Sequence, residues 1–292
     1  MPLPTALFRE IRFATLVCAL LLGPVSAPSQ TAAPTIDLSA SPRSWIVDAA
    51  NNESSIVDRN GVYLRYRTHR IDGKGDIVRD VIETPKGAVA RLIQRNGRSL
   101  TSSEDAAERA RLTAALSSPA DFAKHHSRDN QDRKLTLDLV KLMPDAMLYS
   151  YSVGQPQLPG AVSPQVVLDF KPNPAFHPPN IEAELLTGLE GRIWLDANAR
   201  MMLRLDARII KPMNIGWGLL ARVTPGGTMQ FEQSNAGGIW AYSHLIMRVS
   251  ARLLMVKTEN SNMDVADSNI EKLPAPLSYQ DAIHELLNTP LP

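Results

Sequence analysis

Cysteine is nearly absent from this sequence, since Cys18 is the only one among 292 residues. A single cysteine excludes an internal disulfide and a metal site built from several thiolates. The sequence also lacks an apolar run of the roughly 20 residues that a membrane-spanning helix needs. Because 31 Lys and Arg nearly balance 30 Asp and Glu, no positive surplus points to nucleic acid or an anionic membrane surface. The 44% hydrophobic content is that of a soluble globular protein.

Residues 1–27 have the pattern of a secretory signal peptide. Arg9 and Arg12 precede an apolar run, and small residues follow it. The run has about ten residues, too few to cross a bilayer. We therefore expect cleavage after Ala27 or after Ser29, and a mature protein that is periplasmic or secreted.

The rest of the chain divides into a lead-in segment and one domain. We expect residues 28–59 to be a loose lead-in with a short helix that carries Trp45 and Ile46. Residues 60–292 predict a single domain that begins with antiparallel strands. Alternation of apolar and polar side chains places these strands at residues 62–70, 77–83 and 88–94.

A helical insertion is expected over about residues 102–145. Acidic residues follow Ser102, as is typical of a helix start. A second helix has one apolar stripe and should end before Pro144. Its stripe consists of Leu135, Leu139 and Leu142.

Residues 191–258 predict a continuous antiparallel meander of strands joined by short turns. Leu203 and Leu205 alternate with Met202 and Arg204, so we expect the first pair on a buried face and the second on a solvated face.

Several stretches resemble exported proteins of the lipoprotein-carrier (LolA/LolB-like) superfamily. They are residues 63–68, 77–84, 94–100, 191–196 and 202–208. The resemblance covers most of residues 60–260. It implies an α+β fold: a strongly curved antiparallel sheet, an incomplete barrel, with helices that cover its concave face and an apolar cavity between them. Members of that superfamily bind lipid-like groups or serve as sensors and scaffolds.

No catalytic motif occurs in the sequence. His125 and His126 are adjacent and would point in different directions on a helix, so they do not suit a shared metal. No nucleophile elbow surrounds any serine, and the glycine pairs lack the spacing of a phosphate loop. We therefore expect no enzymatic activity, no metal and no cofactor.

The sequence favours a binding role. Methionine and tryptophan are plentiful in the C-terminal half and suit a cavity for a flexible acyl chain, or equally the core of a curved sheet. The expected ligand is a hydrophobic small molecule, a lipid or the acyl group of a lipidated protein. The expected cavity lining is Leu203, Leu205, Trp217, Leu219, Phe231, Leu135, Leu139 and Leu142. The alternatives are a non-catalytic envelope scaffold or sensor that contacts another envelope protein, and an enzyme with an unrecognised acid/base site.

Overall fold

The computed structural model describes residues 38–58, 61–215, 221–253 and 257–292. Within the chain, Ile36–Pro292 form one compact unit. The helices are α1 (Pro42–Asp58), α2 (Ser102–Leu116), α3 (Pro119–Ala146), α4 (Tyr279–Asn288) and a 3-10 helix, η1 (Glu182–Gly188). The strands are β1 (Leu64–Asp72), β2 (Gly75–Ile82), β3 (Val89–Arg95), β4 (Arg98–Ser99), β5 (Met147–Tyr151), β6 (Gln165–Pro172), β7 (Leu189–Asp196), β8 (Met202–Ile209), β9 (Met213–Ile215), β10 (Ala221–Val223), β11 (Thr228–Ala236), β12 (Ile239–Leu253) and β13 (Lys257–Lys272).

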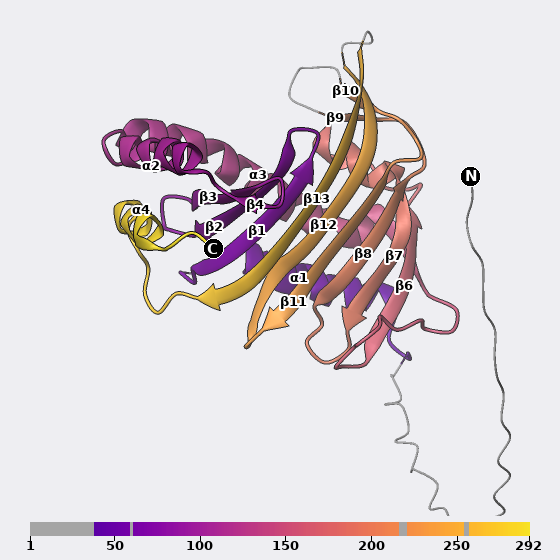
Figure 1. The fold of residues 1–292 in the computed structure, drawn as a ribbon. Coiled ribbons are helices and arrows are strands. Elements are labelled where there is room, and N and C mark those ends of the chain that lie inside the picture. Colours follow the sequence, from indigo (N-terminus) through magenta and orange to yellow (C-terminus); the bar gives the residue numbers. More distant parts are fainter. Residues whose placement is uncertain (1–37, 59–60, 216–220, 254–256) are drawn as a thin grey trace, which may run out of the picture. The chain divides into compact units, whose positions relative to one another are not determined.

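The described strands form one open, antiparallel sheet (Figure 1). The main path runs β4-β3-β2-β1-β13-β12-β11-β8-β7-β6-β5, and the short β9–β10 pair attaches to β12. The end strands β4 and β5 do not pair with each other, so the sheet is not closed. The expected α+β class with an antiparallel sheet is confirmed.

The N-terminal strands lie close to where alternation predicts them. Asn96 and Gly97 both have positive φ, 51° and 71°, as a tight turn between β3 and β4 requires. The first strand then pairs with β13 at the other end of the chain, for example Arg70 with Val265.

The C-terminal half departs from a simple meander. Strand β8 pairs directly with β11, and β10 pairs with β12. The longest strand of this half that the meander includes in full, β12, runs from Ile239 to Leu253. The prediction missed most of β13 and all of α4, because the polar residues of β13 show no alternating apolar face.

The helices pack on both faces of the sheet. Directly paired residues point to the same side, so the register can be followed from strand to strand. Leu205 and Phe231 share one side with Ile77, and α1 and α3 pack there. Ile82 points to the opposite side, where α4 covers it.

Helix α3 connects the two ends of the sheet. Phe122 near its start packs in the cluster on β2 and β3, and Leu139 and Leu142 pack over β6–β8. Its 28 residues span about 42 Å, enough to reach across most of the sheet, whose neighbouring strands lie about 4.8 Å apart. The helix ends at Ala146 and not before Pro144, which it accommodates in its last turn.

A bulge explains why one expected solvated residue is buried. Between β7 and β8 the register shifts, so Trp194 pairs with Arg204 but Leu195 pairs with Met202. Leu203 is the extra residue, and Met202 turns into the core with 8% of its surface exposed.

A buried carboxyl joins α1 to the sheet at this bulge. Glu53 is 3% exposed, and its Oε1 accepts hydrogen bonds from the backbone N–H of Met202 at 3.2 Å and from Nε2 of Gln233. Burial in apolar surroundings raises the pKa of Glu53 to about 7, although both hydrogen bonds favour the charged form. The folded protein therefore holds a proton on Glu53 that the unfolded chain releases at lower pH.

We expect the free energy of unfolding to fall as pH rises from about 4.5 to 7, because the folded state binds the extra proton in this window. The loss should be about 3 kcal/mol. Glu53→Gln should remove this slope, whereas Asp48→Asn, which changes an exposed carboxyl of the same helix, should keep it. Urea unfolding at pH 5 and pH 8 measures the difference. A wild-type free energy of unfolding that is equal at both pH values would contradict this assignment.

Candidate functional site

A cleft of about 740 Å³ lies between α2, the start of α3 and the β3 edge of the sheet. Its apolar lining comprises Val89, Leu92, Leu112, Ala115, Phe122 and Ile283. Its charged residues are Arg79, Arg95, Glu108 and Arg111. Small residues, Ala88, Ala90, Ala114 and Ser118, complete the described lining. We call this site the α2–β3 cleft.

The first wall of the cleft is α2, which a capping box starts. Thr101 accepts a hydrogen bond from the backbone N–H of Glu104, and the Glu104 carboxylate accepts one from the N–H of Thr101 at 2.8 Å. Hydrogen bonds from Arg98, and then from Thr101, lower the pKa of Glu104 to about 2. The start of α2 is thus attached to the β3–β4 hairpin by a carboxylate that stays charged.

Side chains of α2 then bind backbone groups of β3 that a neighbouring strand would otherwise bind. The Glu108 carboxylate accepts from the backbone N–H of Leu92 at 2.8 Å, and Arg111 donates to the carbonyl of Ala90 at 2.7 Å. Arg111 also donates to Glu108, with 2.7 Å between Nη2 and Oε1. Two backbone groups of an exposed sheet edge are satisfied in this way, and α2 is held against it.

The floor of the cleft belongs to the cluster under α4. Phe122 and Tyr279 stack with 4.1 Å between ring centroids. Arg91 is 2% exposed and donates to the carbonyls of Leu286 and Thr289 at the end of α4. A cation at this position is favourable because the carbonyls of the last helical turn lack partners within the helix.

The described charged lining has three arginines and one glutamate, a net charge of +2. Glu108 is already engaged by Leu92 and Arg111, and Arg95 lies 3.8 Å from Glu104. The cleft therefore combines apolar walls with a local positive excess, whereas the whole chain carries a net charge of +1.

The residues expected to line an apolar cavity lie elsewhere. Leu205 is 7% exposed in the cluster between α1, α3 and the sheet, and Leu139, Leu142 and Phe231 pack against this cluster. Leu203 and Leu135 are partly buried outside it. Trp217 and Leu219 lie outside the described residues. None of the six described residues lines the α2–β3 cleft.

A small cavity of about 20 Å³ adjoins this cluster. Glu53, Val140 and Met143 are among its lining residues. It has room for about one water molecule. The expected lining residues are thus found in packed surroundings, while the larger space lies at the β3 edge.

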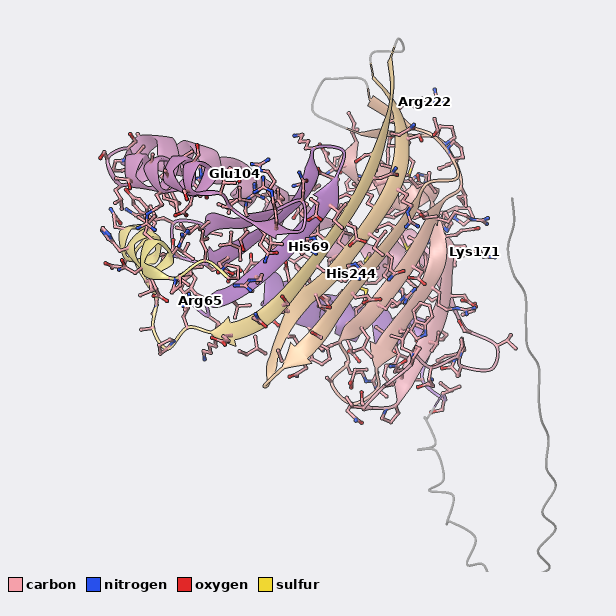
Figure 2. The ribbon with its side chains drawn as sticks, viewed as in Figure 1. Arg65, His69, Glu104, Lys171, Arg222 and His244 are labelled. Carbon is pink, nitrogen blue, oxygen red and sulfur yellow. The ribbon has the colours of Figure 1, made fainter. Side chains whose placement is uncertain are left out.

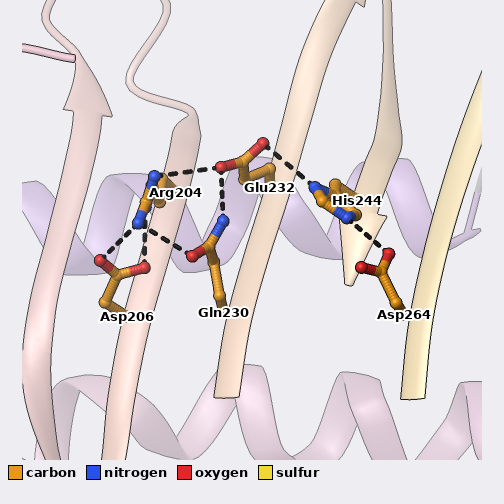
Figure 3. A network of polar contacts seen from close by, with 6 residues as sticks. All are labelled: Arg204, Asp206, Gln230, Glu232, His244 and Asp264. Carbon is orange, nitrogen blue, oxygen red and sulfur yellow. Dashed lines mark hydrogen bonds and ion pairs between the residues drawn. The ribbon is translucent and has the colours of Figure 1, made fainter. Parts of the chain in front are cut away.

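The face of the sheet turned away from α1 and α3, which we call the outer face, carries a second group of polar residues (Figure 3). Arg204 donates to Asp206 at 2.7 and 2.8 Å, to Gln230 at 2.9 Å and to Glu232 at 3.2 Å. Nε2 of His244 lies 2.8 Å from a carboxylate oxygen of Asp264. The carboxylates thus already have partners, Asp206 on its own strand and Glu232 and Asp264 on neighbouring strands.

A hollow of about 630 Å³ on the same face is also balanced in charge. Its described ionic lining has three arginines and three carboxylates: Arg192, Arg208, Arg248, Asp169, Glu190 and Asp206. Arg192 pairs with Asp169 at 2.7 Å, and Arg208 pairs with Glu190. This hollow offers no net charge to a ligand, so the α2–β3 cleft is the stronger candidate.

Comparisons with models of known families, with curated proteins and with solved structures found no match for this chain. Membership of the lipoprotein-carrier superfamily therefore stays a prediction. Within the described residues, no three His, Cys, Asp or Glu side chains are placed to hold a metal ion. None of the described helices is long and apolar enough to cross a membrane.

The sequence analysis did not predict the cleft, although two features of the sequence pointed to its charged residues. Arg79 interrupts an otherwise apolar side of its strand, between Ile77 and Val81. Glu108 and Arg111 are three residues apart, as neighbours on one helix face are. The contact of α2 with the β3 edge could not be derived from that spacing, because it depends on tertiary packing.

We expect Glu108→Leu to lower the free energy of unfolding by about 1–3 kcal/mol, because the buried N–H of Leu92 loses its acceptor. Glu108→Gln keeps a side-chain carbonyl that can accept this hydrogen bond, so it should lose less stability. Urea unfolding of both variants measures the contrast. Equal stability of the leucine and glutamine variants would show that the hydrogen bond to Leu92 contributes nothing.

Proposed function

We propose that this protein is an exported, non-catalytic binding protein that holds a lipid-like ligand in the α2–β3 cleft. The proposal is carried by one observation: the cleft of about 740 Å³ has both apolar walls and an excess of positively charged side chains. Ligand sites commonly enclose about 300–1,000 Å³ and combine apolar walls with a few polar groups.

The walls suit a flexible hydrocarbon chain. Leu92, Leu112, Phe122 and Ile283 have at most 9% of their surface exposed, so they form a fixed apolar lining. Contact with such a lining removes about 0.8 kcal/mol of unfavourable hydration for each buried methylene group of a ligand. An acyl chain thus gains affinity without any specific polar contact.

The fold and the N-terminal sequence support the same proposal. An open antiparallel sheet with packed helices is compatible with the incomplete barrel of lipoprotein carriers, which the sequence resembles. The signal-like pattern of residues 1–27 favours a periplasmic or secreted location, where a lipid or a lipidated protein would be the partner.

One observation favours an envelope scaffold or sensor instead. The cluster between α1, α3 and the sheet is packed, with a cavity of only about 20 Å³ beside it. A protein that used this packed region as a rigid platform would bind another envelope protein and would need no ligand. Titration with a lipid probe separates the two functions.

We expect Ala114→Trp to weaken the binding of a fluorescent fatty acid about tenfold or more, because the indole would occupy the cleft. Thr113→Trp places the same ring at an exposed position of α2 that does not line the cleft, and should bind like wild type. Fluorescence titration below the critical micelle concentration measures both, and thermal unfolding verifies that both variants fold.

Leu205→Trp tests the packed cluster in the same assay. Overpacking a filled core costs roughly 1–3 kcal/mol of stability, so this variant should be less stable but should still bind the fatty acid. Loss of binding at unchanged stability in Leu205→Trp, with full binding in Ala114→Trp, would move the ligand site to the cluster between α1 and α3. Failure of the wild-type protein to bind any fatty acid would favour the scaffold.

A further inference from the structure

Arg79 has an unusual position among the charged residues of the α2–β3 cleft. It lies in the middle of β2, opposite Thr68 on one side and Leu92 on the other. The register shifts between Val78 and Arg79, where β3 has one extra residue. Such bulges redirect side chains and are frequent beside functional sites. The guanidinium therefore emerges next to the apolar wall that Leu92 contributes.

No hydrogen bond or ion pair joins the side chain of Arg79 to another residue that the structure describes. The acid that acts on it is Glu108, whose carboxylate already accepts hydrogen bonds from Leu92 and Arg111. Arg95 and Arg70 have acidic partners of their own, Glu104 and Asp72. Among the described residues that line the cleft, Arg79 is thus the cation whose side chain has no anionic partner.

Its surroundings make the charge unfavourable. Partial burial lowers the pKa of Arg79 first, and the positive charges of Arg111, Arg70 and Arg95 lower it further. A guanidinium nevertheless remains protonated in proteins. The attraction of an incoming anion would therefore offset both the cost of desolvation and the repulsion among the arginines.

We propose that Arg79 binds the acidic headgroup of a single-chain amphiphile, a carboxylate or a phosphate, whose hydrocarbon tail lies along Leu92 and Phe122. This assignment rests on the proposed function and names the class of its ligand. A guanidinium presents parallel N–H donors that match either anion in a two-bond arrangement. A neutral headgroup would leave the charge unmatched, and a cationic headgroup would meet a lining of net charge +2.

The test uses four probes: decanoate, decyl phosphate and 1-decanol, which share one chain length, and inorganic phosphate, which has no tail. Calorimetric titration below the critical micelle concentrations measures their dissociation constants for the full chain. The variants are Arg79→Gln, Arg79→Lys and Arg222→Gln. Arg222 is an exposed arginine of β10, far from α2 (Figure 2), so its variant controls for the loss of one charge.

We expect wild-type protein to bind the two charged decyl probes at least about tenfold more tightly than 1-decanol, since a charge-assisted hydrogen bond contributes about 1.5–3 kcal/mol. Arg79→Gln should bind all three decyl probes with the affinity of 1-decanol. Arg79→Lys should keep part of the preference, and Arg222→Gln should keep all of it. The tighter of decanoate and decyl phosphate identifies the headgroup.

The outcomes separate this inference from the proposed function. Equal binding of charged probes and 1-decanol, with no effect of Arg79→Gln, overturns the role of Arg79 but supports a lipid-binding cleft. Inorganic phosphate that binds as tightly as decyl phosphate, and only when Arg79 is present, supports the anion site but overturns the lipid ligand. If no probe binds, both proposals are wrong.

A salt series on the wild-type protein keeps the inference testable if Arg79→Gln does not fold. Ionic screening weakens the attraction between a partly exposed arginine and an anion. The affinity of decanoate and decyl phosphate should therefore fall between 0.01 and 0.5 M salt, whereas that of 1-decanol should not. Anion binding that is independent of salt would overturn the assignment.

Discussion

The pairing of β1 with β13 is the constraint on which the rest of the sheet depends. It joins the first described strand to the last, with Leu64 opposite Lys272 and Asp72 opposite Met263. Without this pairing, β1–β4 would be a small sheet separate from the other strands. The ordering entropy of so distant a contact must be recovered by packing elsewhere, and apolar clusters on both faces of the sheet provide that packing.

An open sheet leaves two edges, and the treatment of one edge creates the candidate site. At β3, carboxylate and guanidinium groups of α2 bind backbone groups that another strand would bind in a closed sheet. A helix follows a strand edge less closely than a strand does, so space remains beside Leu92 and Phe122. The α2–β3 cleft is a consequence of covering an edge with a helix.

The two faces of the sheet differ in whether their charged side chains are paired. On the outer face, Arg204 pairs with Glu232 and His244 pairs with Asp264 across neighbouring strands, and such partly exposed pairs contribute only about 0–1 kcal/mol each. On the face toward α3, Arg79 lacks a described partner. A cation left unmatched beside apolar walls is a feature that stability alone does not favour, and the proposed anionic ligand supplies a reason for it.

Local pattern was sufficient for many elements of this protein. Alternation located β1–β3 and β8, and acidic residues marked the start of α2, because these features depend on neighbours in the sequence. The helix carrying Trp45 and Ile46 was also predicted, although α1 is longer and belongs to the core.

Only the tertiary structure decided which strands pair and where space remains. The bulge at Leu203 reverses the side on which Met202 lies, and no periodicity reveals a bulge in advance. The polar strand β13 is held by its partners β1 and β12, so its own side chains carry little strand signal. The cleft joins residues of β2, β3, α2 and α4, from Arg79 to Ile283, whose distance along the chain hides their contact. The sequence by itself therefore determined the elements, whereas long-range pairing and the helix at the sheet edge determined the candidate site.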